Sequence, residues 1–376
     1  MGVEEELLLV DPDSGAPLGR AGEVLDSDAG ADLDGEMRPE QVETGSTPHS
    51  GVAALAADLR ARRRDAAAAA AAQGATVAAL ATSPVPPGPA TPPSGRYGEI
   101  HDRFGAVASA QLTNGQHVHV EVGSRDEGVG VLDRIGVWLP TLRALSANSP
   151  FWRGEDTGYA SYRSVVWTRW PSAGPTASLG SVAAYDALVA AMLATGAPLD
   201  EAMVYFDARL AEHFPTVEIR VADVGATVDD AVLVAVLVRA LVATAARAWN
   251  AGEPAPTVPV EVLRLMHWRA ARSGLGGALV DPRTGREAPA ADVLDALREH
   301  VGDALAETSD TDLVERGCAD VLAGTTGAAR QRAVFAEEGL RGVVLDAVGR
   351  GGSEGSEGSE GSGGSEGSEG SHTTRT

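Results

Sequence analysis

Three short apolar segments of the chain each carry two charged or imidazole side chains at alternate positions. The pairs are Glu4 and Glu6 in GVEEELLLV, His117 and His119 in NGQHVHVEVG, and Glu218 and Arg220 in PTVEIRVADV. Side chains at alternate positions of a β-strand lie on the same face. The pattern therefore predicts three strands that each place two polar groups on one face of a sheet.

These polar faces form one surface if the three strands are neighbours. Alternate residues lie ~6.6 Å apart along a strand, and neighbouring strands lie ~4.8 Å apart. Carboxylates that close together cannot all be ionised unless cations neutralise them. Oxygen ligands with one imidazole suit Mg²⁺ or Mn²⁺ better than zinc, and two such ions ~4 Å apart can bind the oxygens of a transferred phosphoryl group. The pattern indicates a metal–nucleotide site.

All 30 basic residues are arginines. Without lysine, the chain cannot form a Walker A phosphate loop, a pyridoxal Schiff base or a lysine nucleophile. Positive charge on substrate phosphates must then come from arginine, whose forked guanidinium binds carboxylate and phosphate with two hydrogen bonds. The candidates for binding substrate or ATP are Arg163, Arg169, Arg209 and Arg220.

Charge and cysteine content exclude several other classes of protein. The net charge of −23 argues against nucleic-acid or anionic-membrane partners. The single Cys318 excludes an internal disulfide and a thiolate zinc site. No apolar run reaches ~18–20 residues without a charge, and no signal peptide is evident, so we expect a cytoplasmic protein. The long apolar helices suggest a homodimer.

Predicted strands occupy the first two-thirds of the chain and predicted helices the last third. The expected strands are 2–11, 75–82, 114–123, 202–210 and 215–224, and the expected helices are 51–73, 97–110, 126–147, 179–194 and most of 228–348. This segregation favours an α+β fold with an antiparallel or mixed sheet over a doubly wound fold. We expect one domain over 1–350, followed by a disordered Gly/Ser/Glu tail over 351–376.

Each polar pair also has a purely structural interpretation. Acidic residues at a strand start often lie on a solvated edge, and a Glu-x-Arg pair is often a cross-strand salt bridge. His-x-His on a strand is often structural, and Arg163 and Arg169 could equally stack on Trp167 and Trp170. The repetition of the same pattern on three strands favours a shared site.

Five motifs in order resemble one known family over Gly2 to about Val348. They are GVEEELLLVDPDSG, EMRPEQVETGSTPHS, TNGQHVHVEVG, LSANSPFWRGEDTGYASYRS and FPTVEIRVADV. Together they resemble the glutamate–cysteine ligase type 2 family, the YbdK-type carboxylate–amine ligases. The resemblance implies a mainly antiparallel six-stranded sheet with helices packed on its outer side, related to the catalytic fold of glutamine synthetase. It also implies ATP-dependent ligation, in which the γ-carboxylate of glutamate becomes an acyl phosphate that an amine such as cysteine attacks.

The resemblance also implies roles for individual residues. The implied metal ligands are Glu4, Glu6, Glu43, His117 and Glu218, with His119 as a further candidate. Arg220 would face the transferred phosphate and, with Glu218, make up the catalytic pair. Arg163 matches the arginine region that receives the amino-acid substrate. The implied cofactor is Mg²⁺ or Mn²⁺, with ATP as co-substrate, and Glu121 departs from the family pattern by adding a carboxylate.

Other functions are consistent with the same residues. One is a metal-dependent amide hydrolase that uses His117 and His119 as ligands, although its further histidines are not evident on strand ends. Another is a non-catalytic Mg-nucleotide-binding relative, and a third transfers phosphate to a guanidine. In the ligase interpretation, the Gly- and aromatic-rich segment 146–176 is expected to be a lid that excludes water.

Overall fold

A computed structural model describes residues 1–88 and 94–353, and its centre is an antiparallel sheet. The hydrogen-bonded order is β2–β3–β1–β5–β9–β8, and β4 pairs with the second half of β1. The strands are β1 (Gly2–Val10), β2 (Leu33–Gly35), β3 (Gln41–Gly45), β4 (Thr76–Ala78), β5 (Gly115–Glu121), β8 (Ala208–Leu210) and β9 (Thr216–Asp223). Every neighbouring pair is antiparallel, which confirms the expected α+β class; β4 makes the sheet seven-stranded rather than six-stranded.

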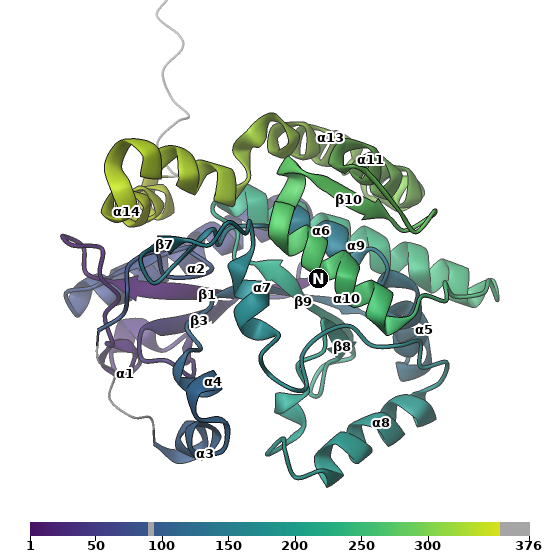
Figure 1. The fold of residues 1–376 in the computed structure, drawn as a ribbon, viewed down its shortest axis with the longest axis horizontal. Helices are drawn as coiled ribbons and strands as arrows, with labels where there is room; N and C mark the ends of the chain where they lie inside the picture. The colour runs from purple at the N-terminus through teal and green to yellow at the C-terminus, as the bar shows by residue number, and fades with distance from the viewer. Residues whose placement is uncertain (89–93, 354–376) are drawn as a thin grey trace, which may run out of the picture.

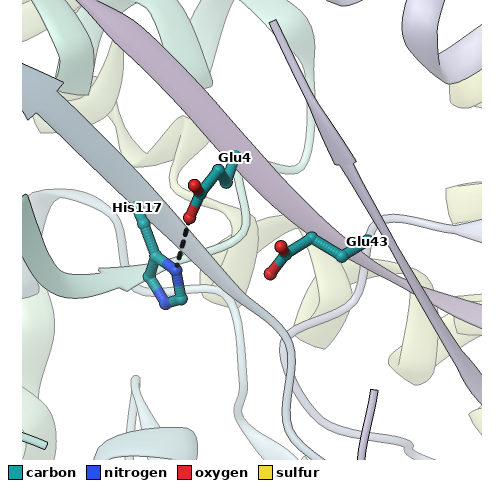
Figure 2. Close-up of side chains that lie close together, drawn as sticks. All are labelled: Glu4, Glu43 and His117. Carbon is teal, nitrogen blue, oxygen red and sulfur yellow. Dashed lines mark hydrogen bonds and ion pairs between the residues drawn. The ribbon is translucent and has the colours of Figure 1, made fainter. Parts of the chain in front are cut away.

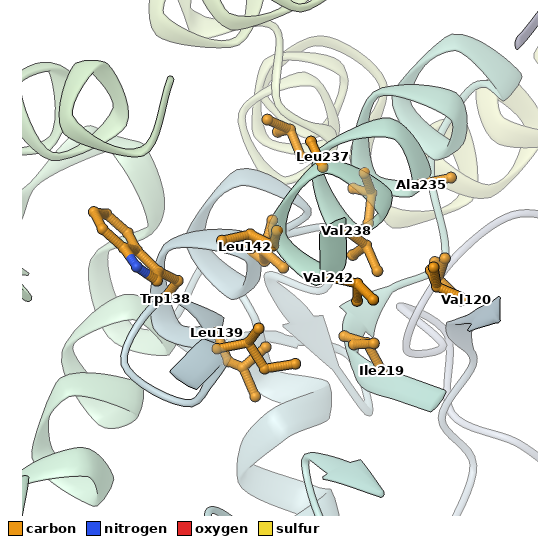
Figure 3. Close-up of a cluster of buried hydrophobic side chains, with 14 of the residues drawn as sticks. Val120, Trp138, Leu139, Leu142, Ile219, Ala235, Leu237, Val238 and Val242 are labelled. Carbon is orange, nitrogen blue, oxygen red and sulfur yellow. The ribbon is translucent and has the colours of Figure 1, made fainter. Parts of the chain in front are cut away.

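One face of the sheet is apolar and covered by helices. The helices on this face are α2 (Val52–Ala72), α5 (Arg125–Ile135) and α9 (Val228–Asn250). Val3 of β1, Val120 of β5 and Ile219 of β9 point into a fully buried core with α9. Figure 3 shows Val238 and Val242 of α9 in this core. The alternation of apolar residues in the strands thus fixes which face the helices cover.

The other face of β1 changes character along the strand. Glu4 and Glu6 lie at its start, whereas Leu8 and Val10 are fully buried under Val344 of the last helix, α14 (Gly327–Ser353). The apolar end of this face is therefore closed by packing. The acidic start faces a cleft, whose wall includes the short helix α7 (Tyr162–Trp167).

The remaining elements surround this framework. They are α1 (Ala21–Leu25), η1 (Asp28–Gly30), α3 (Gly95–Phe104), α4 (Ala106–Ser109), α6 (Leu139–Leu145), β6 (Phe151–Trp152), β7 (Glu155–Asp156), α8 (Val182–Ala194), η2 (Glu201–Met203), α10 (Val260–Ser273), η3 (Gly274–Gly276), β10 (Ala278–Asp281), β11 (Arg286–Pro289), α11 (Ala290–His300), α12 (Gly302–Thr308), α13 (Thr311–Asp320) and η4 (Val321–Thr325). Helices α11 and α13 lie above the sheet in Figure 1, and α3 and α8 lie below it.

Two helices predicted as continuous are interrupted. The expected helix 126–147 is split into α5 and α6 because Pro140 lies in the first turn of α6. Proline has no N–H to donate, and its ring clashes with the carbonyl four residues earlier. The expected helix 97–110 is broken at Gly105, whose φ of +53° is one that glycine tolerates best.

Two strand predictions were wrong in extent, and part of a region expected to be helical forms a hairpin. Only Ala208–Leu210 of 202–210 joins the sheet, because Phe206 and Asp207 pair instead with Gly174. The strand expected over 75–82 is limited to β4. The hairpin of β10 and β11 interrupts the region that was expected to be helical.

The C-terminal boundary and the longest apolar helix complete the comparison. Helix α14 continues to Ser353, so the first three residues of the expected tail are helical, and the rest of the predicted tail lies outside the described residues. Within the described residues, α9 alone is long and apolar enough to cross a membrane, and it is mostly buried inside the fold.

Candidate active site

The polar side chains predicted from three strands lie in one row across five strands. Glu6 is opposite Glu43, Glu4 is opposite His117, and His119 and Arg209 are both opposite Glu218. The row follows from antiparallel register, since each pair of opposite residues places its side chains on the same face. The strands that were expected to be neighbours are neighbours.

A β-bulge adjusts the row between β5 and β9. Gln116 pairs with Ala222 and Val118 pairs with Ile219, so two residues of β9 face His117 alone. One of these is Arg220, whose Nη1 lies 3.5 Å from Nδ1 of His117. The extra residue brings the guanidinium beside the imidazole, as bulges near functional sites commonly re-aim a side chain.

The row forms the floor of an open cleft of about 1120 Å³. Its acidic lining includes all of the predicted carboxylates and two that were not predicted, Glu212 and Glu36, of which Glu36 follows β2 directly. Aromatic walls come from Tyr97, Trp167 and Tyr205, and Phe214 lies at the rim with 62% of its surface exposed. Such a cleft can hold a ligand of nucleotide size above several acidic groups.

Three groups of side chains in the cleft have the composition of cation sites. They are Glu6 with Glu36 and Glu43, Glu4 with Glu43 and His117, and Glu4 with His119 and Glu218; in each group the ligand atoms lie within 4.8 Å of one another. Figure 2 shows Glu43 pointing toward Glu4 and His117, which are 3.2 Å apart at Oε2 and Nδ1. The groups share Glu4 and Glu43, so they follow one another along the row.

The electrostatics of these groups fit divalent cations. Burial, together with the neighbouring Glu6, raises the pKa of Glu36 to about 7, and burial and Glu36 raise the pKa of Glu43 well above its ordinary value. Nε2 of His117 is buried and has no hydrogen-bond partner among the described residues. Buried like charges and an unpaired buried imidazole nitrogen both destabilise the metal-free protein. A bound cation would relieve both. The oxygen-rich donor set suits Mg²⁺ or Mn²⁺.

Two arginines hold Glu218 in its ionised form. Nε of Arg209 donates to Oε2 at 2.6 Å, and Nη1 of Arg220 donates to Oε1. Burial alone would raise the pKa of Glu218, but Arg220 and Arg209 outweigh it and hold the pKa far below its ordinary value. A ligand phosphate can therefore compete for these guanidinium groups while Glu218 stays available to a cation.

The other two predicted arginines lie in different surroundings. Arg163 is buried, does not line the cleft, and packs its guanidinium 5.7 Å from the ring centre of Trp167, which is the cation–π alternative considered from the sequence. Its Nε has no hydrogen-bond partner among the described residues. Arg169 is exposed on the surface near Tyr162 and lies outside the cleft lining. The position of Arg169 does not support a substrate-binding role.

Two further glutamates of the motifs lie outside the cleft. Glu5 is fully buried on the helix-covered face, where Arg63 of α2 binds it with hydrogen bonds of 2.9 and 2.6 Å. The middle carboxylate of the EEE run is therefore structural. Glu121, which departs from the family pattern, is exposed at the end of β5 and does not line the cleft.

The segment 146–176, expected to be a lid, is anchored to the sheet. Asp223 of β9 accepts hydrogen bonds from Oγ of Ser149 and Oγ of Ser161 at 2.7 and 2.9 Å. All three residues are buried. The segment is therefore a fixed wall that positions α7 rather than a free loop.

Comparison with known proteins gives the family. The family model described as glutamate–cysteine ligase family 2 matches residues 1–351. The chain belongs to glutamate–cysteine ligase family 2. A Frankia alni protein provisionally named glutamate–cysteine ligase 2-2 is 50% identical over 368 residues, which cover 93% of this chain and 95% of that protein. A Streptomyces avermitilis protein provisionally named glutamate–cysteine ligase 2-1 is 49% identical over 93% of this chain and 98% of its own length.

Solved structures confirm the fold predicted for the family. A Francisella tularensis glutamate–cysteine ligase in complex with AMP matches with a TM-score of 0.68 at 14% identity, over 93% of this chain and 87% of that chain. A bifunctional glutathione synthetase from Pasteurella multocida matches with a TM-score of 0.64 at 16% identity, over 93% of this chain and 51% of that chain. Family membership confirms the prediction of an ATP-dependent ligase of the glutamate–cysteine ligase type.

Sequence reasoning missed Glu36. It occurs in the quoted motif EMRPEQVETGS, but it follows the short strand β2 rather than lying within an alternating pattern. Glu36 lies seven residues before Glu43, and the turn into β3 brings the two side chains together. The spacing of apolar residues does not predict this turn. The only signal in the sequence was a second acidic segment near the first.

Proposed function

We propose that this family 2 ligase activates the γ-carboxylate of glutamate with ATP and joins it to an amine, with cysteine as one candidate amine. The carboxylate oxygen attacks the γ-phosphorus of ATP, which releases ADP and leaves an acyl phosphate. The amine nitrogen then attacks the acyl carbon, phosphate leaves with the electron pair of the broken C–O bond, and the nitrogen loses a proton. The products are an amide, ADP and phosphate.

In this proposal the cleft floor holds the cations and the arginines hold the phosphates. The residues that would bind Mg²⁺ or Mn²⁺ are Glu4, Glu6, Glu36, Glu43, His117, His119 and Glu218. When bound, these ions supply charge neutralisation for the phosphate oxygens. Arg220 and Arg209 stabilise the charge that builds on the transferred phosphoryl group, and Trp167 excludes water from their side of the cleft.

The observation that carries the proposal is the overlap of three acidic groups along one sheet row. A single group of three acidic side chains is common on protein surfaces. Here three such groups lie inside one cleft and are linked, because Glu43 belongs to two of them and Glu4 to two. They match the several cations that a nucleotide and an acceptor carboxylate require. Arg220 and Arg209, at the end of this row, provide the countercharge for phosphate.

The test is ADP release by the purified protein with Mg·ATP and glutamate, screened across amino acids and simple amines, with the product mass recorded. We expect ADP release that depends on both glutamate and an amine, and a product heavier than glutamate by the amine minus water. Glu218→Ala should abolish ADP release without lowering the thermal midpoint by more than a few degrees, whereas Glu121→Ala should retain it.

Three outcomes would contradict the proposal. Amine release from an amide without ATP would favour the hydrolase, and a phosphoguanidine product would favour phosphate transfer to a guanidine. Binding of Mg·ATP without glutamate-dependent ADP release would favour a non-catalytic relative. The expected homodimer and the expected cytoplasmic location are separate proposals, and sedimentation of the purified protein tests the first of them.

A further inference from the structure

A second cavity of about 960 Å³ borders α7 through Ser164 and Val165, whereas the cleft borders the same helix through Trp167. It is bounded by α6, α7, α10 and the segment 168–175, and it shares no lining residue with the cleft. Helix α10 is fixed to the start of α7, since the carbonyl of Ala271 accepts hydrogen bonds from the N–H groups of Ala160 and Ser161. The cavity is open to solvent, and the elements that line it hold one another in place.

Three buried polar side chains line this cavity, and several of their atoms are unsatisfied. Arg143, Asp207 and His267 are each no more than 4% exposed. Nη2 of Arg143 donates to Oδ1 of Asp207 at 3.0 Å. Nε2 of His267 is 3.3 Å from Oδ2 of Asp207 but is not aligned for a hydrogen bond. Oδ2 of Asp207, both ring nitrogens of His267 and Nε of Arg143 have no hydrogen-bond partner among the described residues.

The charge state of this cluster favours a ligand with a cationic donor. Burial, with Arg143 nearby, lowers the pKa of His267 to about 3 although Asp207 opposes this, so the ring is neutral and can accept a hydrogen bond. Oδ2 of the Asp207 carboxylate is a second open acceptor. A buried acceptor without a donor is unfavourable, and a ligand ammonium group would supply that donor.

The rim of the cavity supplies the opposite charge and an apolar surface. Arg264 of α10 lines the cavity, is exposed, and forms no ion pair with a described residue. Trp268, one turn further along α10, is 53% exposed, and the exposed Pro171 also lines the cavity. An exposed indole at the edge of a cavity offers a packing surface for an apolar ligand group.

We propose that this cavity binds a small amino acid with an apolar side chain. The ammonium group is held by Oδ2 of Asp207 and the ring of His267, the carboxylate by Arg264, and the apolar side chain by Trp268 and Pro171. The zwitterion matches the site because the open acceptors lie at its base and the free guanidinium lies at its rim. A simple amine or a simple carboxylate satisfies only one of the two.

An occupant of this cavity contacts elements that also shape the cleft. The carbonyl of Asp207 accepts a hydrogen bond of 2.9 Å from the N–H of Arg220. Ser164 and Thr168 face the second cavity, and Trp167, which lies between them in sequence, faces the cleft. The binding proposal does not depend on the proposed ligase chemistry, because it can be measured without ATP or turnover.

The test uses L-leucine and L-phenylalanine as probes, with isoamylamine and isovalerate as half-ligands, in titration calorimetry and tryptophan fluorescence on the full chain. We expect saturable binding of at least one amino acid, and at least tenfold weaker binding of both half-ligands. Arg264→Gln and Trp268→Ala are exposed changes that should weaken binding at least tenfold. Leu265→Ala, which is 67% exposed on the same helix outside the cavity, is the matched control and should not change it.

Several results would overturn the proposal. One is the absence of saturable binding of either amino acid at millimolar concentration. Another is binding that Arg264→Gln and Trp268→Ala leave unchanged. A third is binding that Glu218→Ala abolishes while Arg264→Gln does not, since this would place the amino acid in the cleft. Loss of ADP release, by contrast, concerns only the ligase proposal.

Discussion

Individual carboxylates in the cleft differ in whether they stabilise or destabilise the metal-free protein. Glu36, Glu43 and Glu6 lie in one group. Burial and the charge of Glu6 raise the pKa of Glu36, and burial and the charge of Glu36 raise the pKa of Glu43. Like charges that close together oppose folding unless a cation is present. The group of Glu6, Glu36 and Glu43 therefore destabilises the metal-free fold and favours the binding of a cation.

We expect Glu36→Gln to stabilise the metal-free protein and to weaken metal binding. With EDTA at pH 8, loss of one negative charge should raise the thermal midpoint by a few degrees. The Mg²⁺ concentration that gives half-maximal ADP release should rise by about tenfold or more, since one oxygen ligand is lost. Glu121→Gln serves as the control, because Glu121 is exposed outside the cleft. A lower midpoint together with unchanged Mg²⁺ dependence would contradict this role.

We expect Arg220→Lys to reduce kcat much more than it changes metal affinity. The guanidinium of Arg220 contacts Glu218 and His117 and lies 5.8 Å from the ring centre of Trp167. A lysine keeps the charge but loses the fork, and loss of one such donor commonly costs about 10²–10³ in kcat. Steady-state kinetics would measure this, and Mn²⁺ titration would give the metal affinity.

Arg169→Gln is the matched comparison for Arg220. Because Arg169 is exposed and does not line the cleft, we expect kcat and every KM to stay within about twofold of the original protein. A large rise in the KM for glutamate would restore the substrate-binding role predicted from the sequence.

Single residues could be assigned from the sequence where strand alternation decides their face. Glu4, Glu6, His117 and Glu218 lie on one face because their strands alternate cleanly and are neighbours. Glu36 could not be assigned, because it lies after a strand of three residues. Arg163 lies in α7 and Arg169 lies just after it. Because α7 has only six residues, its apolar pattern does not reveal which of the two arginines faces inward.

At the scale of elements, the connection between β3 and α2 is held by one aspartate. Oδ2 of Asp58 accepts hydrogen bonds from the N–H and Oγ1 of Thr47 at 2.9 and 2.8 Å and lies 2.8 Å from Nε2 of His49. The carbonyl of His49 in turn accepts a hydrogen bond from the N-terminal ammonium group of Met1. The start of β1 and the start of α2 are thus joined through this turn.

We expect Asp58→Asn to lower the free energy of unfolding by about 1–2 kcal/mol at pH 7. Burial alone would raise the pKa of Asp58, but His49 and Thr47 outweigh it and lower the pKa to about 2 from 3.8. A lowered folded-state pKa contributes stability above pH 3.8, and that contribution is lost as the pH falls toward 2. Urea titrations at pH 7 and pH 3 should therefore show a smaller difference at the lower pH.

The control for Asp58→Asn is Asp65→Asn on the same helix. Asp65 is exposed, and we expect its replacement to change stability by less than about 0.5 kcal/mol. An equal loss of stability in both variants, or a difference that does not shrink at pH 3, would show that the turn is not held in this way.

Helices and strands could be predicted where the length of a segment and the period of its apolar residues indicated the same structure. They could not be predicted where tertiary contacts determined the structure. Strand β1 and helices α2 and α9 follow from their patterns. The β-bulge opposite His117 could not be predicted from the sequence, because it depends on the register between β5 and β9. The short β8 results from contacts of Asp207 with residues far along the chain.

At the scale of the whole molecule, the sheet order makes the cleft a product of distant segments. Residues 4, 6, 36, 43, 117, 119, 209, 218 and 220 all contribute to it. The antiparallel class could be predicted from the distribution of strands and helices. The order of the strands could not be predicted, since no pattern within a strand specifies its neighbours.

We expect cations and nucleotide to stabilise the whole fold together. Mg²⁺ with a non-hydrolysable ATP analogue should raise the thermal midpoint, since a ligand at 100 times its Kd stabilises by about 2.7 kcal/mol. EDTA should remove the effect, and Glu218→Ala should reduce it strongly. An equal increase with the analogue in EDTA would show that nucleotide binding does not need the acidic row.

The three glutamates at the start of β1 have a consequence for which changes the chain can accept. Glu5 is bound to Arg63 under the helices, while its neighbours on either side face the cleft. An insertion or deletion of one residue ahead of Leu7 would invert this pattern, turning one carboxylate outward and pressing two against valine and alanine side chains. Length variation among natural relatives should accordingly be absent from residues 3–10 and permitted in the surface turn that follows them.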